Sequence, residues 1–143
     1  MVVKQVSIFV ENKKGTIAEA ISLLGKNGIN IRALSVADTS DYGILRLIVN
    51  NPISAEKILK DANYTVKLTD VLGFAVPDVP NGLGEVLNIL NNNNVEIAYV
   101  YSFVGHYKDH AVGIIRTTDL ENTKKILLDN NVIIIDGNVI YQD

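Results

Sequence analysis

Apolar residues change their spacing in a fixed order along the first part of the chain. Val6, Ile8 and Val10 recur at every second position, which predicts a β-strand. The next apolar residues recur at helical spacing and predict a helix; they are Ile17, Ala20, Ile21 and Leu24. Gly28 follows this helix, and glycine is typical of a helix end because it adopts the left-handed conformation readily.

Two strands, a second helix and a last strand are predicted next. The runs INIRALSVAD and GILRLIV are rich in β-branched residues, and the turn-prone DTSDYG between them predicts an antiparallel hairpin. PISAEKILKDA predicts a helix with Pro52 in its first turn, where proline is tolerated, and YTVKL predicts a strand. The order strand, helix, strand, strand, helix, strand is the ferredoxin-like plan, in which two helices cover one face of a four-stranded antiparallel sheet.

The same plan occurs twice. NKKGTIAEAISLLGKNGINI and DVPNGLGEVLNILNNNNVEI align at an offset of 66 residues, which holds through a helix and into a strand. Beyond that strand the offset is 68, because the second copy carries two extra residues in FVGHYKDH. A long internal repeat of this kind indicates two copies of one structural unit.

We therefore predict an α+β protein made of two tandem ferredoxin-like units, residues 1–70 and 71–143. KLTDVLGFAV joins them without a flexible spacer, so we expect docked units whose sheets join into one continuous sheet. Leu45 and Leu47 alternate with Ile44 and Ile48, so apolar residues lie on both faces of a predicted strand. In an antiparallel sheet with one solvent-exposed face, apolar and polar residues alternate more regularly than this. We therefore expect part of the outer face to be covered by the sister unit or another chain.

Composition narrows the classes of function. The chain has 143 residues, 48% of them hydrophobic, which is enough for a core without disulfides. It contains no cysteine, and we expect a cytoplasmic protein without a leader sequence or a membrane span. Residues 1–70 hold nine Lys/Arg and seven Asp/Glu, whereas residues 71–143 hold four and nine. The net charge of −3 and the lack of basic clusters disfavour a nucleic-acid binder, including a ferredoxin-like RNA binder.

In tandem over essentially the whole chain, these residues resemble the ACT domain, a ferredoxin-like module that senses small molecules. Its signature is a D-x-P-G-x-L turn before the first helix and an N-I start to the second strand. The first copy reads NKKGTI and GINI, and the second reads DVPNGL and NVEI. Lys14 replaces the usual proline, Asn81 stands at the glycine position with Gly82 after it, and Glu96 replaces the asparagine that Asn30 supplies.

The resemblance implies that a ligand lies between modules, at one module's turn and the other's second-strand start. A helix N-terminus attracts a carboxylate, glycine lets a ligand approach the backbone, and an acidic side chain attracts an ammonium group. Two pseudo-equivalent sites follow. One joins Asp78, Asn81, Gly82 and Leu83 to Asn30 and Ile31, and the other joins Asn12, Lys14, Gly15 and Ile17 to Glu96 and Ile97. We favour the first for an amino acid, since Lys14 and Glu96 in the second have the charges to pair with each other or with an unlike ligand.

Simpler roles remain open for these residues. Glycine and asparagine at such turns often serve only turn geometry, and Asp78 and Asn12 have side chains suited to capping a helix. Tyr99, Tyr101 and Phe103 share one strand face, where core or interface packing is the favoured role. In HYKDH, His106, Asp109 and His110 lack a fixed fourth metal ligand, and a solvated turn explains them better.

The sequence has no nucleophile with a base, no paired carboxylates and no phosphate loop, so we do not expect an enzyme. We expect no cofactor and no metal. The favoured hypothesis is a regulatory sensor, a homodimer that binds an amino acid and acts on a partner enzyme or regulator. The alternative is a structural or oligomerisation module that binds no ligand and acts through protein partners.

Overall fold

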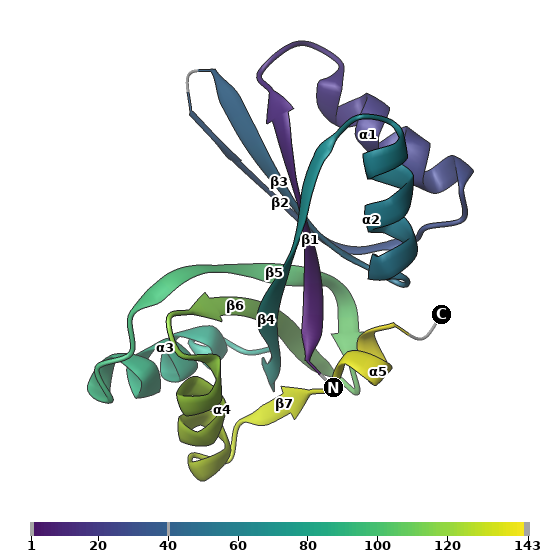
Figure 1. Cartoon of the computed structure of the whole chain (residues 1–143). Helices are drawn as coiled ribbons and strands as arrows, with labels where there is room; N and C mark the ends of the chain where they lie inside the picture. Colours follow the sequence, from purple (N-terminus) through teal and green to yellow (C-terminus); the bar gives the residue numbers. More distant parts are fainter. Residues whose placement is uncertain (1, 40, 142–143) are drawn as a thin grey trace. The chain divides into compact units, whose positions relative to one another are not determined.

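The computed structural model describes residues 2–39 and 41–141 (Figure 1). Ser40, which belongs to the predicted hairpin turn, lies outside the described residues. The first repeat forms six elements in the predicted order: β1 (Val3–Glu11), α1 (Thr16–Lys26), β2 (Ile31–Asp38), β3 (Tyr42–Val49), α2 (Pro52–Asp61) and the first part of β4 (Thr65–Pro77). β1 and β2 both pair antiparallel with β3, and β1 also pairs with β4. This arrangement confirms the ferredoxin-like prediction.

The second repeat uses the rest of β4 as its first strand. It continues with α3 (Gly82–Asn92), β5 (Ile97–Tyr107), β6 (His110–Thr117), α4 (Leu120–Asp129), β7 (Ile133–Ile135) and the short α5 (Gly137–Ile140). Its strand order is β5-β6-β4-β7, with antiparallel neighbours throughout. The second repeat therefore has the same topology as the first, with a shorter last strand.

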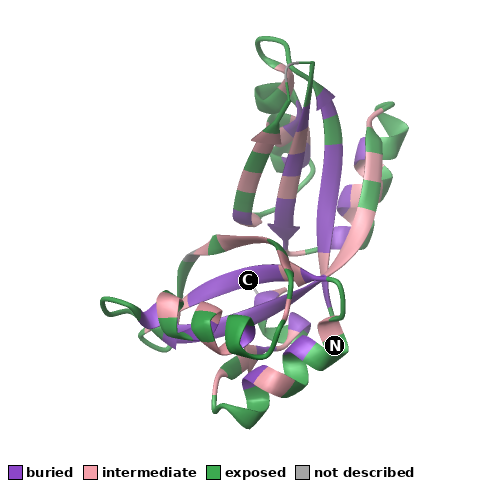
Figure 2. Cartoon of the chain, turned by 90° about the vertical axis from the view of Figure 1, so that its left-hand side faces the viewer, coloured by how far each residue is buried: buried purple, intermediate pink, exposed green. Residues whose placement is uncertain are grey.

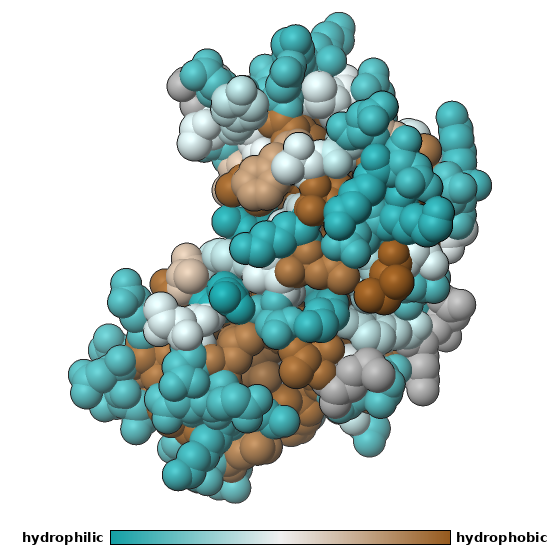
Figure 3. Space-filling view, viewed as in Figure 1, coloured by the Kyte–Doolittle hydropathy of each residue, from teal (hydrophilic) through white to brown (hydrophobic). Residues whose placement is uncertain are grey.

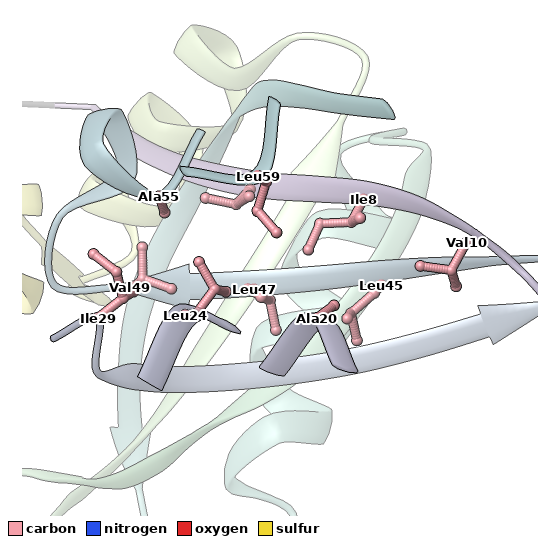
Figure 4. Close-up of a cluster of buried hydrophobic side chains, with 11 residues drawn as sticks. Ile8, Val10, Ala20, Leu24, Ile29, Leu45, Leu47, Val49, Ala55 and Leu59 are labelled. Atoms are coloured by element: carbon pink, nitrogen blue, oxygen red, sulfur yellow. The ribbon is translucent and has the colours of Figure 1, made fainter. Parts of the chain in front are cut away.

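Each repeat has its own apolar core between its helices and one face of its sheet. In the first repeat Leu24 and Leu59, from the two helices, point toward Ile8, Leu45 and Leu47 on the strands (Figure 4). The second core is built in the same way around Phe74, Leu90, Ile115 and Leu127. Buried positions accordingly follow the strands and the inner sides of the helices (Figure 2).

The outer face of the first sheet is also partly buried. Ile48 and its cross-strand partner Ala33 are fully buried there, as is Gln5. Gln5 Nε2 donates to Ser7 Oγ at 2.9 Å, and Ser7 Oγ lies 3.2 Å from Thr69 Oγ1. These bonds satisfy polar groups that would otherwise be costly to bury. The face is buried at these positions, and its coverage by the sister unit or by another chain stays a prediction.

By their contacts the described residues form two compact units. The N-terminal unit comprises Lys4–Thr69 with Ile140 and Tyr141, and the C-terminal unit comprises Asp70–Val139 with Val2 and Val3. Each unit thus includes a few residues from the far end of the chain. The bounds 1–70 and 71–143 and the joining of the two sheets stay predictions. No helix among the described residues is long and apolar enough to cross a membrane.

Candidate ligand-binding site

The turn that opens α3 brings backbone groups very close together. Asn81 occupies the position before the helix with a left-handed backbone, φ 66°. Gly82 follows, and a side chain on it would collide with the carbonyl oxygen of Pro77. The amide of Gly82 donates to the carbonyl of Val79 at 3.0 Å, and that of Val79 donates to the carbonyl of Pro77 at 2.9 Å. Position 82 therefore requires glycine, because the carbonyl of Pro77 lies where any side chain would be.

The helices that open both repeats begin without a capping side chain. Gly15 precedes α1 and Asn81 precedes α3, and neither supplies a side-chain hydrogen bond to the helix. By contrast, Asn51 and Asp119 cap α2 and α4 by accepting from backbone amides at 3.1 and 3.0 Å. The residues at the N-cap positions are Gly15 and Asn81, and neither Asp78 nor Asn12 caps a helix. The interpretation of Asp78 and Asn12 as simple helix caps is therefore wrong. The uncapped first turns keep backbone N–H groups that suit an anion.

A cavity of about 270 Å³ lies beside the turn of the second repeat, within the C-terminal unit. Asp78, Val79 and Leu83 line it from the turn and the start of α3. The sheet contributes residues from three strands, among them Phe74, Val100, Ser102 and Gly113. Two of the predicted site residues, Asp78 and Leu83, therefore meet at one cavity. Figure 3 shows that apolar side chains reach the surface of the unit that carries α3 and α4.

Asp78 is paired with a histidine from another element. His106 Nε2 lies 3.1 Å from Asp78 Oδ2, and both side chains are more than half exposed. His106 belongs to β5, so the interpretation of this part of HYKDH as a solvated turn is wrong; the turn consists of Lys108 and Asp109, both with positive φ. The carboxylate of Asp78 is thus accessible to solvent, and a ligand group can replace His106 as its partner.

The turn of the first repeat is closed differently. The Asn12 amide nitrogen Nδ2 donates to the carbonyl of Thr39 at 3.3 Å, and the Asn12 backbone N–H donates to the carbonyl of Asp41 at 3.0 Å. Beside it Lys13 Nζ lies 2.7 Å from Glu11 Oε2, and this hydrogen bond and the charge of Glu11 raise the pKa of Lys13. The remaining residues predicted here are exposed, namely Lys14, Gly15 and Ile17. This turn offers no carboxylate equivalent to Asp78.

The second-strand starts are placed within their own units. Asn30 is exposed and exchanges two hydrogen bonds with Asn50, at 2.9 and 3.1 Å. Ile31 packs against the first core and Ile97 against the second, while Glu96 is exposed. The assignment of these residues to sites shared with the opposite repeat stays a prediction.

Sequence reasoning missed the sheet residues that form the cavity. Gly113 on β6 is the direct cross-strand partner of Phe74 on β4 and of Ser102 on β5, so the three residues form one rung of the sheet. The repeat itself held the signal, since Gly113 aligns with Leu45 and Ser102 with Val36. Tyr99 and Tyr101 share a strand face as predicted, and their rings stack with centroids 6.3 Å apart.

A larger cavity of about 710 Å³ lies elsewhere in the C-terminal unit. It is lined by Val2, by the ends of β4 and β6 and by the start of α4, and it brings Arg116 and Lys124 near Asp119 and Asp136. Arg116 Nη1 donates to the carbonyl of Asp70 at 2.6 Å. None of the residues predicted to bind ligand lines it, so its size alone does not make it the candidate site.

Comparison with known proteins identifies the repeat. A family model described as "ACT domain pair" matches residues 1–142. The crystal structure of protein BT0572 from Bacteroides thetaiotaomicron is 39% identical, with a TM-score of 0.91, and the match covers 100% of this chain and 98% of that one. The ligand-free regulatory subunit of aspartate kinase from Thermus thermophilus is 10% identical, with a TM-score of 0.63 over 90% and 91% of the two chains. This last likeness concerns the fold alone.

A curated relative matches a shorter segment. The small subunit of acetolactate synthase isozyme 3 from Escherichia coli (strain K12) is 34% identical over 67 residues. That segment is 46% of this chain and 40% of the small subunit. The chain therefore matches less than half the length of this relative.

Proposed function

The chain belongs to the ACT domain pair family, and from this premise we propose that it is a regulatory protein that binds a free amino acid at the turn of its second repeat. The observation that carries the proposal is the cavity of about 270 Å³ beside Asp78 and the uncapped start of α3. Asp78, Asn81, Gly82 and Leu83 form the favoured site.

The turn provides complementary groups for both ends of an amino acid. The exposed carboxylate of Asp78 attracts the ammonium group, since charge-assisted hydrogen bonds are the stronger kind. The N–H groups of the first turn of α3 and the positive end of its dipole attract the carboxylate. Gly82 keeps the backbone of this turn close to Pro77, and the side chain of Asn81 lies against Gly84 in the same turn. Asn30 and Ile31 complete the site in this proposal, as the family resemblance implies.

The second pseudo-equivalent site, at Asn12, Lys14, Gly15 and Ile17 with Glu96 and Ile97, is the weaker candidate. Its polar side chain at the turn is an amide held by the neighbouring hairpin. An amide lacks the charge that attracts an ammonium group, so binding there would lose the strongest polar contact.

We further propose that ligand binding changes the activity of a partner enzyme through a homodimer of this chain. The name of one relative, the small subunit of acetolactate synthase isozyme 3, supports a role beside a partner enzyme. Regulation requires that the amino acid bind one arrangement of the chain more tightly than another. The protein itself performs no chemistry in this proposal.

Calorimetric titration with each of the twenty amino acids tests the proposal. We expect at least one to bind, and a ligand at about 100 times its dissociation constant to raise the free energy of unfolding by roughly 2.7 kcal/mol. Asp78→Ala should weaken binding by about tenfold or more, since a hydrogen bond to a charged group contributes about 1.5–3 kcal/mol.

Asn12→Ala is the matched control, because Asn12 aligns with Asp78 in the other repeat. We expect it to change affinity by less than about twofold, near the error of such a comparison. If no amino acid binds, the alternative of a structural or oligomerisation module is favoured. If Asn12→Ala abolishes binding and Asp78→Ala does not, the ligand occupies the first turn instead.

A further inference from the structure

The two repeats fill the same rung of their sheets with different side chains. In the N-terminal unit the rung consists of Ile8, Leu45 and Val36, which are direct cross-strand partners. In the C-terminal unit the corresponding partners are Phe74, Gly113 and Ser102. Two of the three positions thus carry a much smaller residue in the second repeat. The third carries a larger one, Phe74.

The phenylalanine compensates for the central glycine. A Cβ placed on Gly113 would come within 3 Å of three carbons of the Phe74 ring, so the ring lies directly against the glycine backbone. Phe74 is fully buried in this position. The ring lies over β6, and Phe74 and Ser102 both line the cavity, with Ser102 at the position where the first repeat has the branched side chain of Val36. A hollow remains between β5 and the start of α3, where the cavity of about 270 Å³ lies.

Apolar side chains make up most of the walls of this hollow. Phe74, Val76 and Val100 line it from the sheet, and Val79 and Leu83 line it from the turn and α3. Val79 and Leu83 are 58% and 43% exposed although both are large and apolar. The charged group on the wall is Asp78, at the turn. The cavity therefore has an apolar interior beside an acidic group.

We propose that this cavity receives the side chain of the bound amino acid and that the ligand is an α-amino acid with an aliphatic or aromatic side chain. The inference rests on the proposed function and adds the class of ligand and a specificity-determining residue, Ser102. Its small side chain leaves room for the ligand, whereas Val36 occupies the equivalent position in the first repeat. Side-chain recognition therefore belongs to the second repeat alone, and each chain binds one ligand.

A series of ligands tests the side-chain preference by calorimetry on the full chain. Affinity should rise from glycine through alanine and valine to leucine, by about fourfold for each buried carbon, which corresponds to about 0.8 kcal/mol. Valine should bind at least about tenfold more tightly than threonine, which has nearly the same shape but buries a hydroxyl group. The stoichiometry should be one ligand per chain.

Ser102→Val copies the first repeat and should weaken leucine binding by about tenfold or more, because overpacking a filled cavity typically costs about 1–3 kcal/mol. Alanine should be affected much less. Val36→Ser, the reverse change in the first repeat, is the matched control and should leave leucine affinity unchanged. Ser102 is exposed on a strand, so the variant should fold; Ser102→Thr adds less bulk and should give a smaller loss.

The outcomes separate this inference from the proposed function. Equal binding of leucine, threonine and aspartate would overturn the side-chain preference while amino-acid binding stands. Unchanged leucine affinity in a folded Ser102→Val chain, or two ligands per chain, would overturn the assignment to the second-repeat cavity. Absence of binding by all twenty amino acids would overturn both.

Discussion

Gly113 is a strand residue whose lack of a side chain determines the position of a neighbour. Glycine usually weakens a strand, because it packs nothing and gains freedom on unfolding. Here the buried ring of Phe74 lies against its backbone. The aligned pair in the first repeat, Leu45 and Ile8, fills its rung with two branched side chains of similar size. A pair of residues, rather than either one alone, therefore sets the shape of the second core.

Gly113→Ala should lower the free energy of unfolding by about 1–3 kcal/mol, because the added methyl group overpacks against Phe74. Combining it with Phe74→Ile should give a loss smaller than the sum of the single losses by at least about 0.5 kcal/mol. Urea denaturation of the four chains measures this coupling.

Gly25→Ala is the control for the general effect of replacing glycine. Gly25 lies in α1 with open space around it, so alanine should stabilise the chain by up to about 1 kcal/mol through helix propensity. Additive losses at Gly113 and Phe74 would show that the ring has moved away from the glycine.

At the scale of the element, the two extra residues of the second repeat are accommodated inside a strand. The pairing of β5 with β6 shifts register between Ser102 and His106, and Gly105 there has φ 105°. β2 pairs with β3 without a shift over the equivalent stretch, from Ala33 to Asp38. The irregular segment places His106 opposite Ala111, within reach of Asp78. A strand irregularity therefore supplies a partner for the site carboxylate.

The pairing predicts that His106 competes with the ligand for the carboxylate of Asp78. His106 Nε2 lies 3.1 Å from Asp78 Oδ2, the atom that the ligand ammonium would contact in the proposed site. Because an exposed pair contributes at most about 1 kcal/mol, His106→Ala should raise amino-acid affinity by up to about fivefold. Calorimetry on the two chains measures the change.

His110→Ala is the matched control for this competition. His110 belongs to the same hairpin, but its Nδ1 lies 3.2 Å from the carbonyl of Lys108 and not beside Asp78. Its replacement should leave amino-acid affinity unchanged. Lower affinity in a folded His106→Ala chain would contradict the competition.

At the scale of the whole molecule, both ends of the chain contribute to the unit built from the other half. Ile140 and Tyr141 group with Lys4–Thr69, while Val2 and Val3 group with Asp70–Val139. Ile140 is 3% exposed, and the Tyr141 hydroxyl accepts a hydrogen bond from the backbone N–H of Lys4 at 2.7 Å. The stability of the N-terminal unit therefore depends on residues at the C-terminal end.

Ile140→Ala should lower the free energy of unfolding by about 2–4 kcal/mol, as expected for truncation of a buried aliphatic side chain. Hydrogen exchange should show the loss in the amides of β1 and β3, within the N-terminal unit. Val139→Ala is the control, since Val139 is 42% exposed and its truncation should cost less than about 0.5 kcal/mol. Unaltered exchange in β1 after Ile140→Ala would show that the end of the chain contributes nothing there.

The sequence alone determined the order of elements, the repeat and the position of the helix-opening turns. These features depend on local periodicity and turn chemistry, which each segment carries in its own residues. Asp78 and Leu83 were predicted as site residues from the resemblance of this turn to the ACT domain, and both line the cavity.

Only the tertiary structure decided which turn opens onto a cavity and which partner holds Asp78. Both depend on cross-strand register, because Gly113 matters only opposite Phe74 and His106 reaches Asp78 only after the shift within β5. Register is set by the pairing of distant segments and by irregularities within them, and neither appears in the periodicity of a single strand.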